Sequence, residues 1–290
     1  MTLYRQIAEN KRRTFFLFFF TFLIIISLGY LFGAYYGDSY VGASLAFLFT
    51  IFYSLFSYFF SANIVLAISG AKPIKKSDNP YLYRMVENLC IGAGLPIPKI
   101  YIIDESALNA FATGRDQNHA VVAVTKGLLE SLENEELEGV LAHELSHIQN
   151  QDIKVMTLAA VLAGSIVMLA NIFLRSSSWG SSRRKEGAGI LILVGLILAL
   201  LSPIIAQLIK LAISRQREFL ADSSGVLLTR YPEGLARALE KISRDPMPLQ
   251  HVSEATAHLY IKNPLTKGMF VGLFATHPPV EERLRRLRSS

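Results

Sequence analysis

The stretch NEELEGVLAHELSHIQNQD, residues 134–152, carries two histidines four positions apart. Apolar residues recur along it at helical spacing, Asn134 suits the N-cap, and acidic residues follow in the first turn, where the helix dipole favours negative charge. Because positions i and i+4 lie nearly above one another on a helix, His143 and His147 can direct their rings at a single ion. The stretch therefore predicts a helix that presents two metal ligands on one face.

This pair of histidines predicts a zinc site, whereas the alternative is a helix with two surface histidines. The chain has six histidines in 290 residues, so a chance pair of this kind is uncommon. A catalytic zinc ion keeps three protein ligands and an open position for water. Glu144 lies between the two histidines and suits a general base that takes a proton from this water. We expect one Zn2+ per chain and one further protein ligand.

The remaining ligand is expected in RQREFLAD, residues 215–222. Glu218 and Asp222 are again four residues apart, so both can lie on one helical face. We assign Glu218 to the metal and expect Asp222 to accept a hydrogen bond from the far ring nitrogen of a ligand histidine, which fixes its tautomer. A solvated acid pair flanked by Arg215 and Arg217 is the alternative interpretation.

Four motifs occur in order along the chain: NAFATG (109–114), AHELSHI (142–148), REFLAD (217–222) and FATHPPVEERL (274–284). Together they resemble the M48 family of membrane zinc metallopeptidases, and four ordered motifs are far more specific than HExxH alone. The resemblance implies that His143, His147 and Glu218 bind zinc. It further implies that Glu144 is the general base, that Asp222 orients a ligand, and that the peptidase core is thermolysin-like, known as a gluzincin core.

The composition predicts an integral membrane protein. Hydrophobic residues make up 51% of the chain and the mean hydropathy is +0.35, which is high for a soluble protein. The excess is concentrated in four blocks, at 14–36, 41–71, 155–174 and 188–213. The first block contains no charge and spans about 34 Å as a helix, enough to cross the hydrocarbon core. A cleaved signal peptide is the alternative, but the block is too long and no small-residue cleavage site follows it.

These blocks divide the chain into four parts. We expect an N-terminal transmembrane hairpin at 1–71, a first catalytic part with the HExxH helix at 72–153, a second hydrophobic hairpin at 154–213, and a second catalytic part with the third ligand at 214–290. The expected fold class is an α+β membrane protein. It would combine four hydrophobic, membrane-spanning helices with a gluzincin-like zinc peptidase domain that contains a small β-sheet.

Charge predicts the orientation in the membrane. Basic residues flank the first hairpin, which places the catalytic side in the cytoplasm by the positive-inside rule. The linker between the last two blocks conflicts with this orientation, because Arg175, Arg183, Arg184 and Lys185 would then lie outside. Either the first helices set the orientation, or the second hairpin enters the bilayer without crossing it. We favour crossing, and the resemblance implies a multi-pass protein of the bacterial cytoplasmic (inner) membrane.

The polar part of the chain between the hairpins predicts a helix at 79–91 and strands at 99–103, 109–113 and 120–125. The resemblance implies that Asn109, Ala110, Phe111 and Ala112 form an edge strand, to which a peptide substrate adds as an extra strand. The alternative is a core strand in which Phe111 simply packs.

Two further candidates lie in the last motif. His277 precedes two prolines and is a candidate donor to the developing oxyanion, although such a histidine is also typical of a structural turn. Arg283 is a second candidate for oxyanion or site support.

Charge and cysteine content indicate the partners. Net charge is +6, but the basic residues are dispersed or lie beside apolar runs, as expected for contact with anionic lipid headgroups rather than with nucleic acid. Cys90 is the single cysteine, so no intrachain disulfide can form, which fits a reducing compartment. We expect the lipid bilayer and membrane-protein or unfolded polypeptide substrates as partners, and the oligomeric state is open.

The sequence thus predicts a zinc-dependent endopeptidase that acts at the cytoplasmic membrane surface, and the resemblance implies quality control of misfolded or damaged membrane proteins under stress. One alternative is a CAAX-type processing metalloprotease, which would need a large chamber that four spans hardly enclose. The other is a non-catalytic zinc-binding membrane adaptor. Structural zinc sites are closed by four protein ligands that usually include cysteine, and this chain has one cysteine.

Overall fold

The computed structural model describes residues 37–161, 215–251, 256–262 and 278–289, together with scattered residues between 12 and 34. The hydrophobic block at 188–213, most of the block at 155–174 and His277 lie outside the described residues. The fold below is that of the described part.

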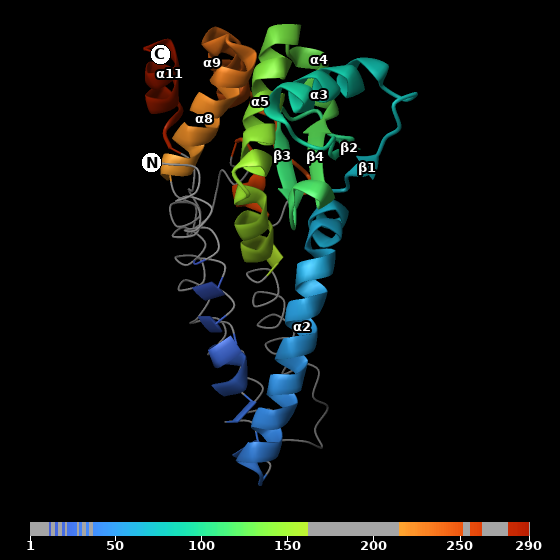
Figure 1. The fold of residues 1–290 in the computed structure, drawn as a ribbon, viewed down its shortest axis with the longest axis vertical. Helices are drawn as coiled ribbons and strands as arrows, with labels where there is room; N and C mark the ends of the chain where they lie inside the picture. The colour runs from blue at the N-terminus through green and yellow to red at the C-terminus, as the bar shows by residue number, and fades with distance from the viewer. Residues whose placement is uncertain are drawn as a thin grey trace.

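A four-stranded sheet forms one layer of the polar part, in the order β1-β2-β4-β3 (Figure 1). Its strands are β1 (Lys72–Pro73), β2 (Lys99–Ile103), β3 (Ala110–Gly114) and β4 (Ala120–Thr125). The strands β2 and β4 are parallel, whereas β1 and β3 pair antiparallel with their neighbours. The expected strands are therefore present, and β3 is an edge strand of the sheet.

Helices cover the sheet and build the rest of this part. They are α3 (Pro80–Ala93), α4 (Lys126–Ser131), α5 (Asn134–Gln149), α8 (Arg215–Thr229), α9 (Pro232–Arg244) and α11 (Val280–Arg288), with 3-10 turns η1 (Gln117–His119) and η2 (Ala257–Leu259). The helix α5 lies between β3 and β4 on one side and α8 and α9 on the other (Figure 1). Its buried side chains, such as Val140 and Leu141, join Val122 and Val124 of β4 in one core. The expected α+β fold with a small sheet is confirmed.

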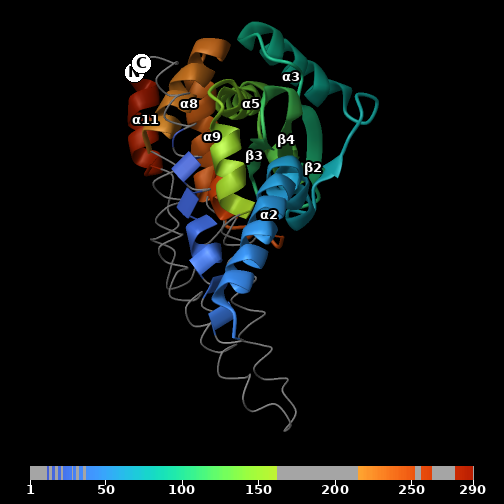
Figure 2. The ribbon, with the colours of Figure 1, turned by 60° about the horizontal axis from the view of Figure 1, so that its bottom comes forward.

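The helix α2 (Ser39–Ile68) projects away from the sheet (Figures 1 and 2). Asp38 caps its first turn by accepting hydrogen bonds from the backbone N–H groups of Tyr40 and Val41. Large apolar side chains such as Phe52 and Leu45 are exposed along it. Within the described part of the chain, no single helix is long and apolar enough to span a membrane, whereas the two halves of α2, Ser39–Tyr53 and Leu55–Ile68, meet these requirements together across a bend of 49°.

The boundaries of α5 differ from the sequence expectation. Glu133, rather than Asn134, occupies the N-cap, because its side chain and that of Glu136 form a reciprocal capping box. At the other end, α5 stops at Gln149, Gln151 adopts a left-handed backbone with φ 57°, and a new helix begins at 152. The chain therefore turns sharply after the HExxH helix before it enters the third hydrophobic block.

We expect Gly139→Ala to destabilise the protein by about 1–3 kcal/mol, because overpacking forces backbone shifts. A Cβ at Gly139 would lie 2.7 Å from the backbone nitrogen of Leu235, where α5 meets α9. The matched control is Gly92→Ala in α3, where a Cβ meets only the end of the Leu228 side chain, at 3.0 Å. Thermal unfolding in detergent should show a lower midpoint for Gly139→Ala alone. Equal midpoints for the two variants would contradict the close contact between α5 and α9.

Candidate active site

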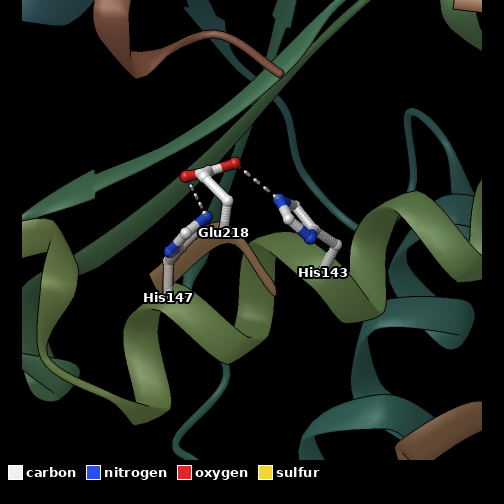
Figure 3. Close-up of side chains that lie close together, drawn as sticks. All are labelled: His143, His147 and Glu218. Atoms are coloured by element: carbon white, nitrogen blue, oxygen red, sulfur yellow. Dashed lines mark ion pairs between the residues drawn. The ribbon is translucent and has the colours of Figure 1, made fainter. Parts of the chain in front are cut away.

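The predicted metal ligands converge from two helices. His143 and His147 lie one turn apart on α5, and Glu218 lies in the first turn of α8. The Nε2 atom of His143 lies 3.8 Å from Oε2 of Glu218, and that of His147 lies 3.6 Å from Oε1. Figure 3 shows both rings pointing at the Glu218 carboxylate from α5. All three side chains are buried, so the structure brings the two histidines together with a glutamate that lies 71 positions after His147 and 75 after His143.

The geometry of this cluster fits a zinc ion. Ligand atoms about 2.0–2.2 Å from a tetrahedral zinc ion lie about 3.4 Å from one another. The two nitrogen–oxygen distances, 3.6 and 3.8 Å, are close to this separation. Within the described residues, the group that could hold a metal consists of these three side chains, all of whose ligand atoms lie within 4.8 Å of one another. Three ligands leave a position for water, as in a catalytic rather than a structural site.

A glycine allows α8 to approach α5 this closely. A Cβ at Gly225 would lie 3.1 Å from the backbone nitrogen of His143, which is tighter than an ordinary van der Waals contact. Because Gly225 lies two helical turns after Glu218 on α8, it keeps the face that carries the carboxylate against α5.

Asp222 and Arg283 lie next to His143. Oδ1 of Asp222 is 3.0 Å from Nδ1 of His143, and the Arg283 guanidinium donates to both Asp222 oxygens at 2.9 and 2.6 Å. Burial alone would raise the pKa of Asp222, but the Arg283 charge and the His143 hydrogen bond lower it well below its usual range. Arg283 is fully buried and its Nη1 lies 3.9 Å from Glu218, so its charge faces the metal-site carboxylates.

Asp152, which the sequence interpretation did not single out, lies beside His147. Its Oδ2 atom is 3.2 Å from Nδ1 of His147, and its side chain is 2% exposed. Burial acts to lower the pKa of His147, but the hydrogen bond to Asp152 and the charge of Glu218 raise it to about 9. This acidic pocket therefore favours a cation, which can be a proton or a metal ion. In the sequence, Asp152 is visible only as an acidic residue five positions after His147. It can reach His147 only because the chain turns at Gln151.

Glu144 is buried next to the ligands. Burial raises its pKa, while His143, His147 and a backbone hydrogen bond from Ala112 of β3 act to lower it. Burial prevails, so the pKa of Glu144 is raised above that of an ordinary glutamate.

The N-terminal half of the predicted substrate strand is already paired. Ile261 donates its backbone N–H to the Ala110 carbonyl at 3.0 Å. The Asn109 side chain donates to the Lys262 carbonyl at 2.9 Å and accepts from the Lys262 N–H at 3.2 Å. Phe111 is buried, and its ring packs edge-on against Tyr260 with centroids 4.9 Å apart. The strand β3 is thus both an edge of the sheet and partly covered.

The remaining histidines lie away from this cluster. His251 bonds to Glu105, His258 contacts the Met156 carbonyl, and His119 contacts Asp116 on an exposed turn. His277 lies outside the described residues, so its predicted role stays a prediction.

Two histidines from one HExxH helix, a glutamate from a distant helix and a buried glutamate between the histidines define a zinc metallopeptidase site. The model of peptidase family M48 matches residues 76–290, and the chain belongs to this family. The predicted zinc metalloprotease is therefore confirmed.

Relatives match almost the whole chain. A protease HtpX homolog of Dictyoglomus turgidum is 47% identical over 287 residues, covering 99% of this chain and 94% of that protein. A protease HtpX homolog of Thermoanaerobacter pseudethanolicus is 48% identical over 295 residues, covering 99% and 98%.

The crystal structure of S. mikatae Ste24p is similar in fold. It superimposes with a TM-score of 0.50 at 22% sequence identity, covering 92% of this chain and 62% of that chain. This chain thus spans less than two thirds of the length of Ste24p, and the likeness shows the fold alone.

We expect Glu218→Ala to weaken zinc binding by at least about 100-fold. Mutation of a residue that only hydrogen-bonds to a metal ligand already weakens binding by about 10–100-fold, and Glu218 is itself a ligand. Chelator competition on the purified full chain measures this loss. The control is Glu135→Ala, which removes an exposed carboxylate from the first turn of α5. Unchanged zinc affinity in Glu218→Ala would place the third ligand elsewhere.

Proposed function

We propose that this protein is a membrane endopeptidase in which Glu144 is the general base. The observation that carries the proposal is the convergence of His143, His147 and Glu218 beside this buried carboxylate. Zinc held by these three ligands supplies a Lewis acid that polarises the scissile carbonyl and makes water more acidic. Glu144 takes the proton from the attacking water and passes it to the leaving amine, without a covalent acyl-enzyme.

Asp222 and Arg283 support the ligands in this proposal. Asp222 accepts a hydrogen bond from the Nδ1–H of His143, so that Nε2 would present its lone pair to the metal. Arg283 holds Asp222 through two hydrogen bonds, and its position supports a role in organising the site. A contribution of His277 to oxyanion stabilisation remains part of the proposal.

The substrate would bind as an extra strand on β3. The backbone hydrogen bond of Ala112 to Glu144 supports this proposal, because it keeps β3 beside the proposed base. A peptide that pairs with the Ala110 carbonyl requires the Ile261 amide to leave it, and a peptide that contacts the Asn109 side chain requires Lys262 to leave. Main-chain pairing of this kind places little demand on the substrate sequence, which suits proteolysis of unfolded chains.

The proposed location is the bacterial cytoplasmic membrane, with four spanning helices, a gluzincin-like core and the active site facing the cytoplasm. Two cation–π contacts at the end of α2 near the sheet support a membrane interface there. Arg115 lies over the Phe59 ring at 5.1 Å, and Lys154 lies over the Tyr58 ring at 5.4 Å. Lys154 follows His147 by seven residues, so the site would lie close to the bilayer.

The proposed substrates are misfolded or damaged membrane proteins, cleaved in quality control during stress. The full-length similarity to proteins named protease HtpX homolog supports this assignment. Closeness of the site to the lipid surface supports it independently, because cytoplasmic loops and tails of membrane proteins reach such a site first.

We expect Glu144→Gln to lower kcat by about 100- to 10,000-fold while zinc binding is retained, because the variant loses the base but no metal ligand. Cleavage of an unfolded membrane protein by purified enzyme in detergent measures the rate, and metal analysis measures the zinc content. Glu135→Gln, on the exposed side of α5, is the matched control. Cleavage by Glu144→Gln at the control rate would refute the assigned base.

We also expect an uncleaved peptide to accelerate hydrogen exchange at Ile261 and Lys262. The Ile261 amide is bound to the Ala110 carbonyl and the Lys262 amide to the Asn109 side chain, so a substrate strand on this edge displaces the segment that carries both amides. Exchange is measured by mass spectrometry on the Glu144→Gln variant with saturating peptide. If the peptide binds but exchange in the segment 256–262 slows or stays constant, the peptide does not pair with the Asn109–Ala110 end of β3.

A further inference from the structure

Each ligand histidine is held by its own carboxylate. The Nδ1 atom of His143 faces Asp222 at 3.0 Å, whereas that of His147 faces Asp152 at 3.2 Å. In both rings the opposite nitrogen, Nε2, faces Glu218. A carboxylate that accepts a hydrogen bond from Nδ1–H fixes the tautomer in which Nε2 is free to bind a metal. Asp152 therefore contacts His147 in the same way as Asp222 contacts His143, at the ring nitrogen that faces away from Glu218.

An arginine accompanies each of these carboxylates. Arg283 donates to Asp222, and the Nε atom of Arg217 lies 3.6 Å from Oδ1 of Asp152. Arg217 directly precedes Glu218 on α8, and its side chain is 11% exposed. The site thus contains two arrangements of histidine, carboxylate and arginine, one for each ligand ring, although Asp152 of the second lies outside the four sequence motifs.

The backbone is shaped to bring Asp152 to His147. On a continuous helix, a residue five positions later would point about 140° away from His147. Here α5 ends at Gln149, and the left-handed backbone of Gln151, φ 57°, redirects the chain before the next helix begins at 152. A left-handed conformation is unfavourable for a residue other than glycine, so the surrounding contacts must stabilise it.

Asp152 also joins two distant parts of the chain. It begins the helix that follows the HExxH helix, whereas Arg217 lies in α8, which comes after residues 162–214 in the sequence. The Asp152 carboxylate therefore contacts both His147, a ligand on α5, and Arg217, which directly precedes the ligand Glu218 on α8. The acidic group at a helix start is itself favourable, so a purely structural role is the competing explanation.

We infer that Asp152 is a positioning residue that holds His147 in the metal-binding tautomer and orientation, and that Arg217 holds Asp152 in turn. The inference rests on the zinc site of the proposed peptidase, but it concerns metal binding and does not require that any peptide be cleaved. Loss of the carboxylate charge should therefore alter zinc binding even where the fold is intact.

The test compares Asp152→Asn with Asp152→Ala in the purified full chain. Asparagine keeps a hydrogen-bond acceptor and a good helix-capping side chain but removes the charge. We expect Asp152→Asn to weaken zinc binding by about 10- to 100-fold in chelator competition, and Asp152→Ala to weaken it further. The absorption spectrum of the Co2+-substituted protein should change in both variants, because the orientation of a ligand ring changes. Arg217→Gln should show a smaller loss in the same direction.

The matched control is Asp116→Asn, since Asp116 contacts Nδ1 of His119 at 2.7 Å on an exposed turn away from the zinc ligands. It should leave zinc affinity and the Co2+ spectrum unchanged. Thermal unfolding of the metal-free variants separates a structural role from a positioning role. If Asp152→Asn lowers the unfolding midpoint but leaves zinc affinity and the Co2+ spectrum as in the wild type, the inference is wrong. If the proposed proteolysis is wrong, the wild-type protein will not cleave peptide, but the differences in zinc affinity and in the Co2+ spectrum between the wild type and the Asp152 variants will still be measurable.

Discussion

The packing of α8 against α5 is the contact on which the site depends. It brings Glu218 within 3.6–3.8 Å of the two histidine Nε2 atoms, and it leaves only 3.1 Å between a Cβ at Gly225 and the backbone nitrogen of His143. Neither helix holds a complete ligand set alone. The helix α5 contributes buried side chains to the core, and Val226 and Leu228 of α8 pack against that core. The geometry of the metal site therefore follows from the packing of two helices rather than from a loop.

Burying several charges together has a large desolvation cost, and this site offsets it by pairing. The Asp222 carboxylate is bound by Arg283, and that of Asp152 lies beside Arg217 and His147. The Glu218 carboxylate lies between the two histidine rings. Such an acidic interior is costly without a cation, so metal binding should stabilise the fold as well as supply the chemistry.

The covered edge of β3 links substrate access to the fold. Tyr260 packs on Phe111, and Ile261 and Lys262 fill the hydrogen-bonding groups of Ala110 and Asn109. A protease that accepts unfolded chains must keep its own and neighbouring folded proteins from its cleft. Because the edge of β3 is partly paired within the protein, fewer of its backbone groups are open to another polypeptide. This agrees with selective access of substrates in the proposed function.

The sequence by itself determined the ligands, the helix that carries two of them, the strands of the sheet and the family, because these follow from local periodicity and from motifs with fixed spacing. It did not determine Asp152 as a partner of His147, the N-cap at Glu133 or the coverage of Asn109 by Lys262. The N-cap is set locally, by the capping box of Glu133 with Glu136. The other two contacts depend on where the chain turns and on which distant segment packs there, and such contacts leave no periodic signal. Only the tertiary structure decided these two: the turn at Gln151 and the approach of Arg217 on α8 place Asp152, and the segment 256–262 beside β3 covers Asn109.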